Sequence, residues 1–153
     1  MQAPKIIVIT GSTRGIGYGL AEAFLQLGCA VTVSGRSRES SAAVVGQLAA
    51  QHDASHVFGL ACDVTLPEQV ESLWAASVAH FGRVDIWVNN AGFTGEMGMA
   101  WERPAEEMQS VIATNLVGTI LGSQVALRGM QKQDHGAIYN MEGMGSGGRK
   151  HAG

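Results

Sequence analysis

Three glycines stand near the start of the chain, where a hydrophobic run gives way to a helical pattern. Residues 6–9 form a short run of β-branched residues, which is typical of a strand buried on both faces. Gly11, Gly15 and Gly17 follow this run, and from residue 16 apolar residues recur at helical spacing. Glycines at such a turn let backbone N–H groups and the positive end of a helix converge on an anion. The residues predicted to hold a phosphate are Gly11, Ser12, Thr13, Arg14, Gly15, Ile16 and Gly17.

That loop has an alternative interpretation, a glycine-rich turn that serves only the packing of helix on strand. Polar residues elsewhere favour the binding site, because they also follow predicted strands. Strands are predicted over residues 30–34, 56–61 and 84–88. The carboxyl ends of parallel strands meet at one edge of a sheet, so these positions should converge there. The further residues predicted to bind a cofactor are Arg36, Ser37, Asp63, Val64, Asn90, Ala91 and Gly92.

Arg36 indicates which nicotinamide cofactor the site prefers. It stands where an acidic residue would bind the ribose 2′-hydroxyl of NAD. A guanidinium matches a 2′-phosphate instead, and Arg14 can approach the same group. The sequence therefore predicts NADPH, against the alternative that both arginines are solvated surface residues. Asp63 has a competing role too, since it can cap the turn before Thr65.

Strand and helix patterns alternate along the whole chain. Helices are predicted over residues 16–27, 40–51, 65–81 and 104–130, and a fifth strand over 137–141. This order predicts an α/β fold, a Rossmann-type doubly wound parallel sheet with three αβα layers, as one domain over residues 1–153. A glycine-rich stretch after the fifth strand normally introduces another element, so the domain is expected to be truncated after that strand and incomplete at its C-terminus.

Two details of these helices can be predicted. In the first, Ile16, Leu20, Phe24 and Leu27 recur at steps of four, four and three, and are expected to form the inner face. In the third, Thr65 and Glu68 have the spacing of a capping box, with a proline in the first turn.

Composition limits the classes of function. Charged residues make up 15% of the chain, against about 25% in a typical domain, so further chain or another subunit is expected to cover part of the surface. The net charge of −3, with no basic run, argues against nucleic acid. No uninterrupted apolar stretch approaches 18 residues, so no membrane span is expected. The two cysteines lack metal-ligand spacing, and a strand that begins near residue 5 leaves no room for a signal peptide. These features predict a cytoplasmic protein without a metal site.

The glycine spacing, preceded by Thr10, resembles that of the short-chain dehydrogenase/reductase family, and matching segments extend to Asn140. The resemblance implies hydride transfer between NADPH and a small-molecule carbonyl or alcohol substrate. It further implies that Asp63 contacts adenine and that the Asn-Asn-Ala-Gly segment at 89–92 bends close to the cofactor. Asn115 matches the family's catalytic asparagine, which joins a proton relay; the alternative is a plain surface asparagine.

The family's other catalytic groups do not carry over directly. The family uses a tyrosine with a lysine four residues later, but neither Tyr18 nor Tyr139 has that lysine. Gly143 stands at the position of the family's serine. Residues 140–148, Asn-Met-Glu-Gly-Met-Gly-Ser-Gly-Gly, resemble a segment of the chlorophyll b reductase branch. That resemblance implies that Ser146 is catalytic, against the alternative of a flexible loop serine.

Two functions of different classes follow. The first is a reductase acting on a carbonyl such as the formyl group of a chlorophyll b-like pigment, a homo-oligomer when complete. The second is a non-catalytic NADPH-binding module or inactive fragment, consistent with the missing tyrosine–lysine pair. In both cases the 153-residue chain alone is expected to be inactive as a reductase.

Overall fold

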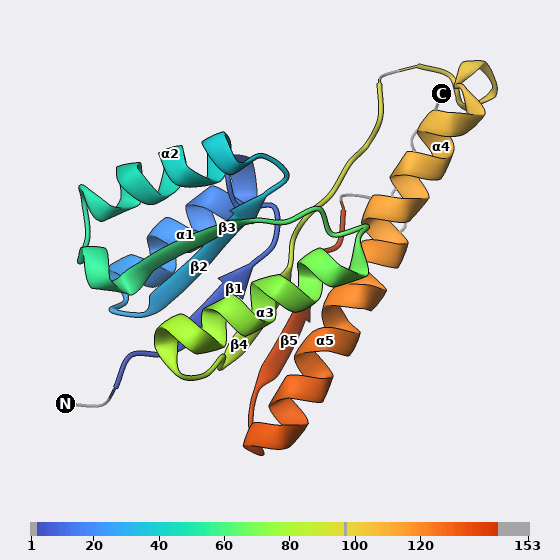
Figure 1. The fold of residues 1–153 in the computed structure, drawn as a ribbon. Coiled ribbons are helices and arrows are strands. Elements are labelled where there is room, and N and C mark those ends of the chain that lie inside the picture. Colours follow the sequence, from blue (N-terminus) through green and yellow to red (C-terminus); the bar gives the residue numbers. More distant parts are fainter. Residues whose placement is uncertain (1–2, 97, 144–153) are drawn as a thin grey trace.

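The short apolar runs form a parallel sheet of five strands in the order β3-β2-β1-β4-β5 (Figure 1). The computed structural model describes residues 3–96 and 98–143. β1 lies at the centre with every residue buried, and the strand order reverses between β1 and β4, since the chain crosses from β3 to β4 on the other half of the sheet. In such sheets ligands bind beside that point, outside the carboxyl ends of the strands. The strands are β1 (Ile6–Ile9), β2 (Ala30–Gly35), β3 (Val57–Ala61), β4 (Ile86–Asn89) and β5 (Ala137–Asn140).

Helices cover both faces of the sheet, which confirms the doubly wound, three-layer prediction (Figure 1). A π-helical turn at Ala113–Val117 joins α4 to α5, so that the two form one continuous helix. Short 3₁₀ turns occur at Ala54–His56 and Ala100–Glu102. The α-helices are α1 (Gly15–Gln26), α2 (Arg38–Ala49), α3 (Pro67–Phe81), α4 (Ala105–Ile112) and α5 (Gly118–Gln133).

Alternation along the strands divides the core between the two faces. Ile7 and Ile9 of β1 point to the layer of α1 and α2, where they pack with residues such as Leu25 and Leu48. Val8 points the other way, to the layer of α3 and α5. Because successive strand residues face opposite sides, the unbroken apolar run of β1 supplies both layers at once.

The inner face predicted for α1 is wrong by about one position. Ile16 and Leu27 are 68% and 77% exposed. The buried residues are Gly17, Ala21 and Leu25. Two of these are small, which lets the helix axis approach the sheet closely, and this approach decides which side faces inward. Leu20 and Phe24 are partly buried and pack against the same cluster.

The capping box predicted before α3 is also absent. Leu66 is the N-cap and no side chain caps this helix, although the proline does stand at its first turn. The Thr65 hydroxyl instead donates to Asp63 Oδ1 at 2.7 Å. The Thr65 hydroxyl, which the capping box required, is therefore used in the turn that precedes α3.

The continuous helix from Ala105 to Gln133 has an apolar outer face. Its inner side carries small residues, and a Cβ on Gly118 would lie 2.6 Å from Val64 Cγ2. This close packing leaves the larger apolar side chains exposed on the other side. The exposed residues are Met108, Ile112, Leu116, Val117, Ile120 and Leu127.

This helix bears on the expectation that the chain has no membrane span. It spans 29 residues, and an 18-residue window has a mean hydropathy of 1.4, enough to cross a membrane by length and composition alone. The polar residues that interrupt its apolar run include few charged ones, since the window holds at most two. One side of the helix packs against the sheet and α3, and 22% of that window is buried.

Candidate functional site

The glycine loop, residues 11–17, joins β1 to α1 and packs closely against residues 90–91. Gly11 and Gly15 have φ angles of +62° and +58°, in the left-handed region that favours glycine. A Cβ on Gly11 would lie 2.6 Å from Ala91 Cα. A Cβ on Gly17 would lie 2.6 Å from the Gly11 carbonyl oxygen and would also meet Asn90 Nδ2. The loop thus needs glycine both for its backbone conformation and for its contact with residues 90–91.

Asn90 fixes the glycine loop from the neighbouring strand. Its Nδ2 donates to the carbonyl oxygens of Thr10 and Gly11, at 2.9 and 3.0 Å. In return the Thr10 hydroxyl oxygen accepts from the backbone N–H groups of Asn90 and Ala91, at 3.0 and 3.1 Å. These bonds join residues about 80 positions apart in the sequence and hold the loop in one shape.

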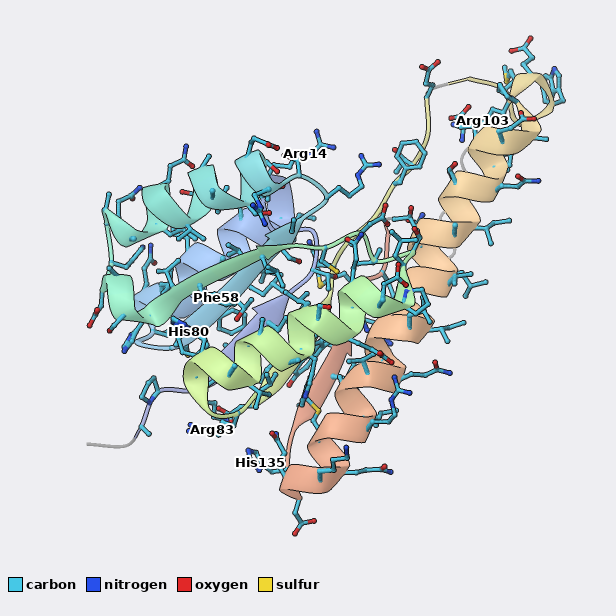
Figure 2. The ribbon with its side chains drawn as sticks, viewed as in Figure 1. Arg14, Phe58, His80, Arg83, Arg103 and His135 are labelled. Atoms are coloured by element: carbon cyan, nitrogen blue, oxygen red, sulfur yellow. The ribbon has the colours of Figure 1, made fainter. Side chains whose placement is uncertain are left out.

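The first turn of α1 is left open for an anion. Arg14 is the N-cap, makes no side-chain capping bond, and no acidic residue stands in the first turn. The unpaired N–H groups of a helix start and its positive dipole end favour an anionic ligand. Arg14 and Ile16 are exposed at this end, where Figure 2 shows Arg14 projecting from the loop.

Ser12 and Thr13 have structural roles in the loop. Ser12 is buried; its Oγ donates to the Ile9 carbonyl oxygen at 2.7 Å and accepts from the Ser34 N–H at 2.9 Å. It therefore ties β1 to β2 just where the phosphate is predicted to bind. The side chain of Thr13 packs over Gly35, where a Cβ would lie 2.6 Å from Thr13 Cγ2.

The end of β2 carries exposed cationic groups. Arg36 and Arg38 line a cavity of about 460 Å³, together with Gln69 and the outer side of β3. The Ser37 hydroxyl oxygen accepts from the Ser40 N–H at 3.1 Å and so caps α2. Both guanidinium groups are exposed beside this cavity, whereas the Ser37 hydroxyl is already hydrogen-bonded; the predicted contact of Ser37 with the cofactor stays a prediction.

Asp63 has the turn role that the sequence left open. Its Oδ1 accepts from the backbone N–H and the hydroxyl of Thr65, at 3.0 and 2.7 Å. Its own N–H donates to Gln69 Oε1 at 2.8 Å. A contact of Asp63 with adenine stays a prediction, as does one of Val64, which is buried. Burial, with a smaller contribution from the Asp63 charge, raises the pKa of Cys62 to about 12, so this thiol stays protonated at neutral pH.

Asn115 is exposed, and both polar groups of its side chain are hydrogen-bonded. It lies in the π-helical turn between α4 and α5. Its Oδ1 accepts from the Phe93 N–H, and its Nδ2 donates to the Phe93 carbonyl oxygen, both at 2.8 Å. Phe93 directly follows Gly92, so Asn115 holds the chain where it leaves the site. The Asn115 carbonyl oxygen accepts from the Thr119 hydroxyl at 2.8 Å.

Asn89 belongs to the segment 89–92 but was not among the residues predicted to bind the cofactor. Its Oδ1 accepts from the Trp87 indole N–H at 2.8 Å, and its Nδ2 donates to Ser123 Oγ at 2.9 Å and Asn140 Oδ1 at 2.8 Å. The doubled asparagine was the available signal, because successive residues in a strand point in opposite directions. Asn90 reaches the glycine loop, and Asn89 reaches α5 and β5.

These features match one protein family. The family model for short chain dehydrogenases matches residues 5–150. The chain belongs to this family. The matched range includes the glycine loop, the doubled asparagine and Asn115.

Relatives within the short-chain dehydrogenase family include two plant proteins. The chain is 40% identical to the probable chlorophyll(ide) b reductase NYC1 of Arabidopsis thaliana, named as chloroplastic, over 95% of this chain and 32% of that protein. It is 39% identical to the chloroplastic chlorophyll(ide) b reductase NOL of the same plant, over 97% of this chain and 43% of that protein. The chain thus spans well under half the length of these relatives.

A solved structure of the same fold is that of an actinorhodin polyketide ketoreductase variant with NADPH. It superposes with a TM-score of 0.87 at 33% sequence identity, covering 99% of this chain and 58% of that chain. This agreement confirms the predicted Rossmann-type architecture.

The short-chain dehydrogenase catalytic groups are only partly within the described residues. The Met141 N–H donates to the Asn89 carbonyl oxygen at 2.9 Å, which continues the pairing of β5 with β4 beyond Asn140. Glu142 and Gly143, the family's serine position, follow at the same sheet edge as the glycine loop. Ser146 lies outside the described residues, and its catalytic role stays a prediction.

Replacing Trp87 by phenylalanine is expected to destabilise the fold through Asn89. The change removes the indole N–H and leaves Asn89 Oδ1 buried without its donor, which costs about 1–3 kcal/mol. Trp74→Phe is the matched control, because the Trp74 indole N–H has no hydrogen-bond partner within residues 3–96 and 98–143. Urea unfolding should show the larger loss for Trp87→Phe. Equal losses would mean that ring volume, and not the hydrogen bond, sets the effect.

Proposed function

We propose that this chain forms the NADPH-binding part of a short-chain oxidoreductase that transfers hydride between NADPH and a carbonyl or alcohol substrate. The observation that carries the proposal is the interlocked glycine loop. Two left-handed glycines, a buried Gly17 and the Asn90 amide hold an uncapped helix start at the carboxyl edge of the sheet. This arrangement suits a pyrophosphate.

The preference for NADPH over NADH rests on Arg36. Arg36 and Arg38 present two exposed guanidinium groups beside one cavity at the end of β2. β2 ends at Gly35 and Arg36 follows directly, where an acid would accept from a ribose hydroxyl. The ketoreductase of the same fold is a complex with NADPH, which supports the same cofactor here.

The proposed substrate is a carbonyl compound such as the formyl group of a chlorophyll b-like pigment. Both plant relatives are named chlorophyll(ide) b reductases and are similar along nearly the whole chain. We assign Asn115 to the proton relay and Ser146 to the hydroxyl that polarises the carbonyl. Their support is the position of Asn115 beside the cofactor loops and the likeness of residues 140–148 to that branch.

A second copy of the chain is proposed to cover the apolar outer face of α4 and α5. Six large apolar residues of this face are between 38% and 58% exposed, and the chain is poor in charge. Size-exclusion chromatography with light scattering would test this homo-oligomer. The cytoplasmic location stays a prediction, and the plant relatives are named as chloroplastic.

The second candidate is a module that binds NADPH without chemistry. It is favoured by the two tyrosines, neither of which has a lysine four residues later. Proton delivery to the substrate needs a positioned donor, and a tyrosine without that lysine is a poor one at neutral pH.

Activity of the protein made from its complete reading frame separates the candidates. NADPH binding is followed by fluorescence titration, and NADPH oxidation by absorbance with a formyl-bearing chlorin and with small ketones. The reductase predicts binding together with carbonyl-dependent oxidation, whereas the module predicts binding alone. The 153-residue chain, assayed in parallel, is expected to bind NADPH without turning it over. Absence of NADPH binding by the complete protein would contradict both candidates.

A further inference from the structure

The loop that follows β4, residues 93–96, has its backbone bound by side chains of the long helix and of Arg103, which precedes that helix. Arg103 Nη1 donates to the Thr94 carbonyl oxygen at 3.1 Å, and its Nη2 donates to the Glu96 carbonyl oxygen. Glu107 Oε1 accepts from the Glu96 N–H. Asn115 binds both backbone groups of Phe93. These three side chains, Arg103, Glu107 and Asn115, are called the loop clamp below.

The loop is shaped to admit the clamp. Gly95 has a φ angle of +73°, and a Cβ there would meet Glu107 Oε1 and lie 3.2 Å from Arg103 Nη1. The absent side chain of Gly95 thus makes room for both charged heads against the loop backbone. Figure 2 shows Arg103 where the loop meets the start of α4. Hydrogen bonds to charged groups are among the stronger ones in proteins, so the segment 93–96 is held firmly.

The position of this loop gives the clamp a function. The predicted adenosine site lies at the ends of β2 and β3, beside Arg36 and Asp63. A dinucleotide that passes the glycine loop from there places its nicotinamide end toward β4 and β5. The loop leaves β4 at that end, directly after Gly92, and Phe93 is 37% exposed on a backbone that the clamp holds.

We propose that Arg103 and Glu107 are positioning residues that, with Asn115, fix the loop so that Phe93 forms one side of the substrate site. This inference rests on the proposed reductase function. A fixed aromatic side chain beside the reacting end suits a flat, apolar carbonyl substrate, since aromatic groups stack with little loss of conformational entropy. The clamp acts only through the loop; its two charged residues need not touch the substrate.

The first experiment measures the clamp itself, by amide hydrogen exchange of the 153-residue chain. Glu107→Ala and Arg103→Met are expected to speed exchange of the Glu96 N–H by at least about tenfold, because each removes a charged hydrogen-bond partner of the loop. Glu106→Ala and Arg128→Met are the controls. Glu106 has no side-chain bond among the described residues, and Arg128 bonds only Glu71 there. Unchanged exchange in both clamp variants would overturn the proposal.

The second experiment measures kinetics in the protein made from its complete reading frame. Phe93→Ala and Glu107→Ala are expected to raise KM for a flat, apolar carbonyl by about tenfold, with kcat within about twofold and the Kd of NADPH unchanged. A purely structural role would lower the active fraction, and hence apparent kcat, without moving KM. That pattern, or an equal rise in the Kd of NADPH, would overturn the positioning role. If the unmodified protein fails to turn over, the proposed function and the positioning role fail together, while hydrogen exchange still decides whether the clamp exists.

Discussion

A Gly17→Ala protein is expected to bind NADPH about a hundredfold more weakly than the parent. The added Cβ would lie 2.6 Å from the Gly11 carbonyl oxygen and 2.8 Å from Ser12 Cα, and would meet Asn90 Nδ2. Two of these atoms belong to the backbone of the glycine loop, so the loop must open to make room. Losing two hydrogen bonds to a phosphate, at about 1.5 kcal/mol each, corresponds to roughly a hundredfold.

Gly19→Ala is the matched control for this change. Both glycines lie in α1 and neither has a positive φ, but a Cβ on Gly19 would meet nothing within 4 Å. Gly19→Ala should leave NADPH affinity unchanged and raise the free energy of unfolding by about 0.5–1 kcal/mol, because alanine favours a helix more than glycine does. Calorimetric titration and urea unfolding measure the two quantities. Similar affinities for the two variants would contradict the close packing of loop and helix.

Replacing Arg36 by alanine is expected to weaken NADPH binding about ten- to a hundredfold and NADH binding little. A charge-assisted hydrogen bond to the 2′-phosphate contributes roughly 1.5–3 kcal/mol, and about 1.4 kcal/mol is tenfold in affinity. NADH lacks that phosphate, so the same substitution removes no comparable interaction. The measurement is a titration of the variant with both cofactors at one ionic strength, since exposed charges are screened by salt.

Arg128→Ala controls for the loss of a positive charge in general. Arg128 lies on α5 and pairs with Glu71 at 3.0 Å, with both side chains more than half exposed. Its replacement should change the affinity for neither cofactor. An equal loss of NADPH and NADH affinity in Arg36→Ala would show that the arginine supports the fold and does not bind the 2′-phosphate.

The sequence alone was enough to predict the architecture and the sheet edge at which a cofactor is expected to bind. The alternation of β-branched runs with helical patterns is a local property, and each run carries its own signal in a few residues. The glycine loop, Arg36, Asp63 and Asn90 each follow such a run directly, so parallel strand order was enough to bring them to one edge. The strand ends differ from the predicted ones by up to two residues, as local patterns allow.

The partners of individual side chains could not be predicted from the sequence and depend on tertiary packing. The inner face of α1 depends on how closely the helix approaches the sheet at Gly17 and Ala21. The local hydrophobic pattern does not indicate that distance. Asp63 accepts a hydrogen bond from the Thr65 hydroxyl within the same turn. That hydroxyl is therefore not available to cap α3 as the sequence predicted.

Partners far apart in the chain were beyond any local pattern. Asn90 bonds residues 79 and 80 positions away, Asn89 bonds Asn140 across 51 positions, and Asn115 bonds Phe93 across 22. Such contacts depend on which strands become neighbours and on how closely a helix lies on the sheet. The sequence indicates that these asparagines are available to donate and accept, whereas packing selects the atoms they meet.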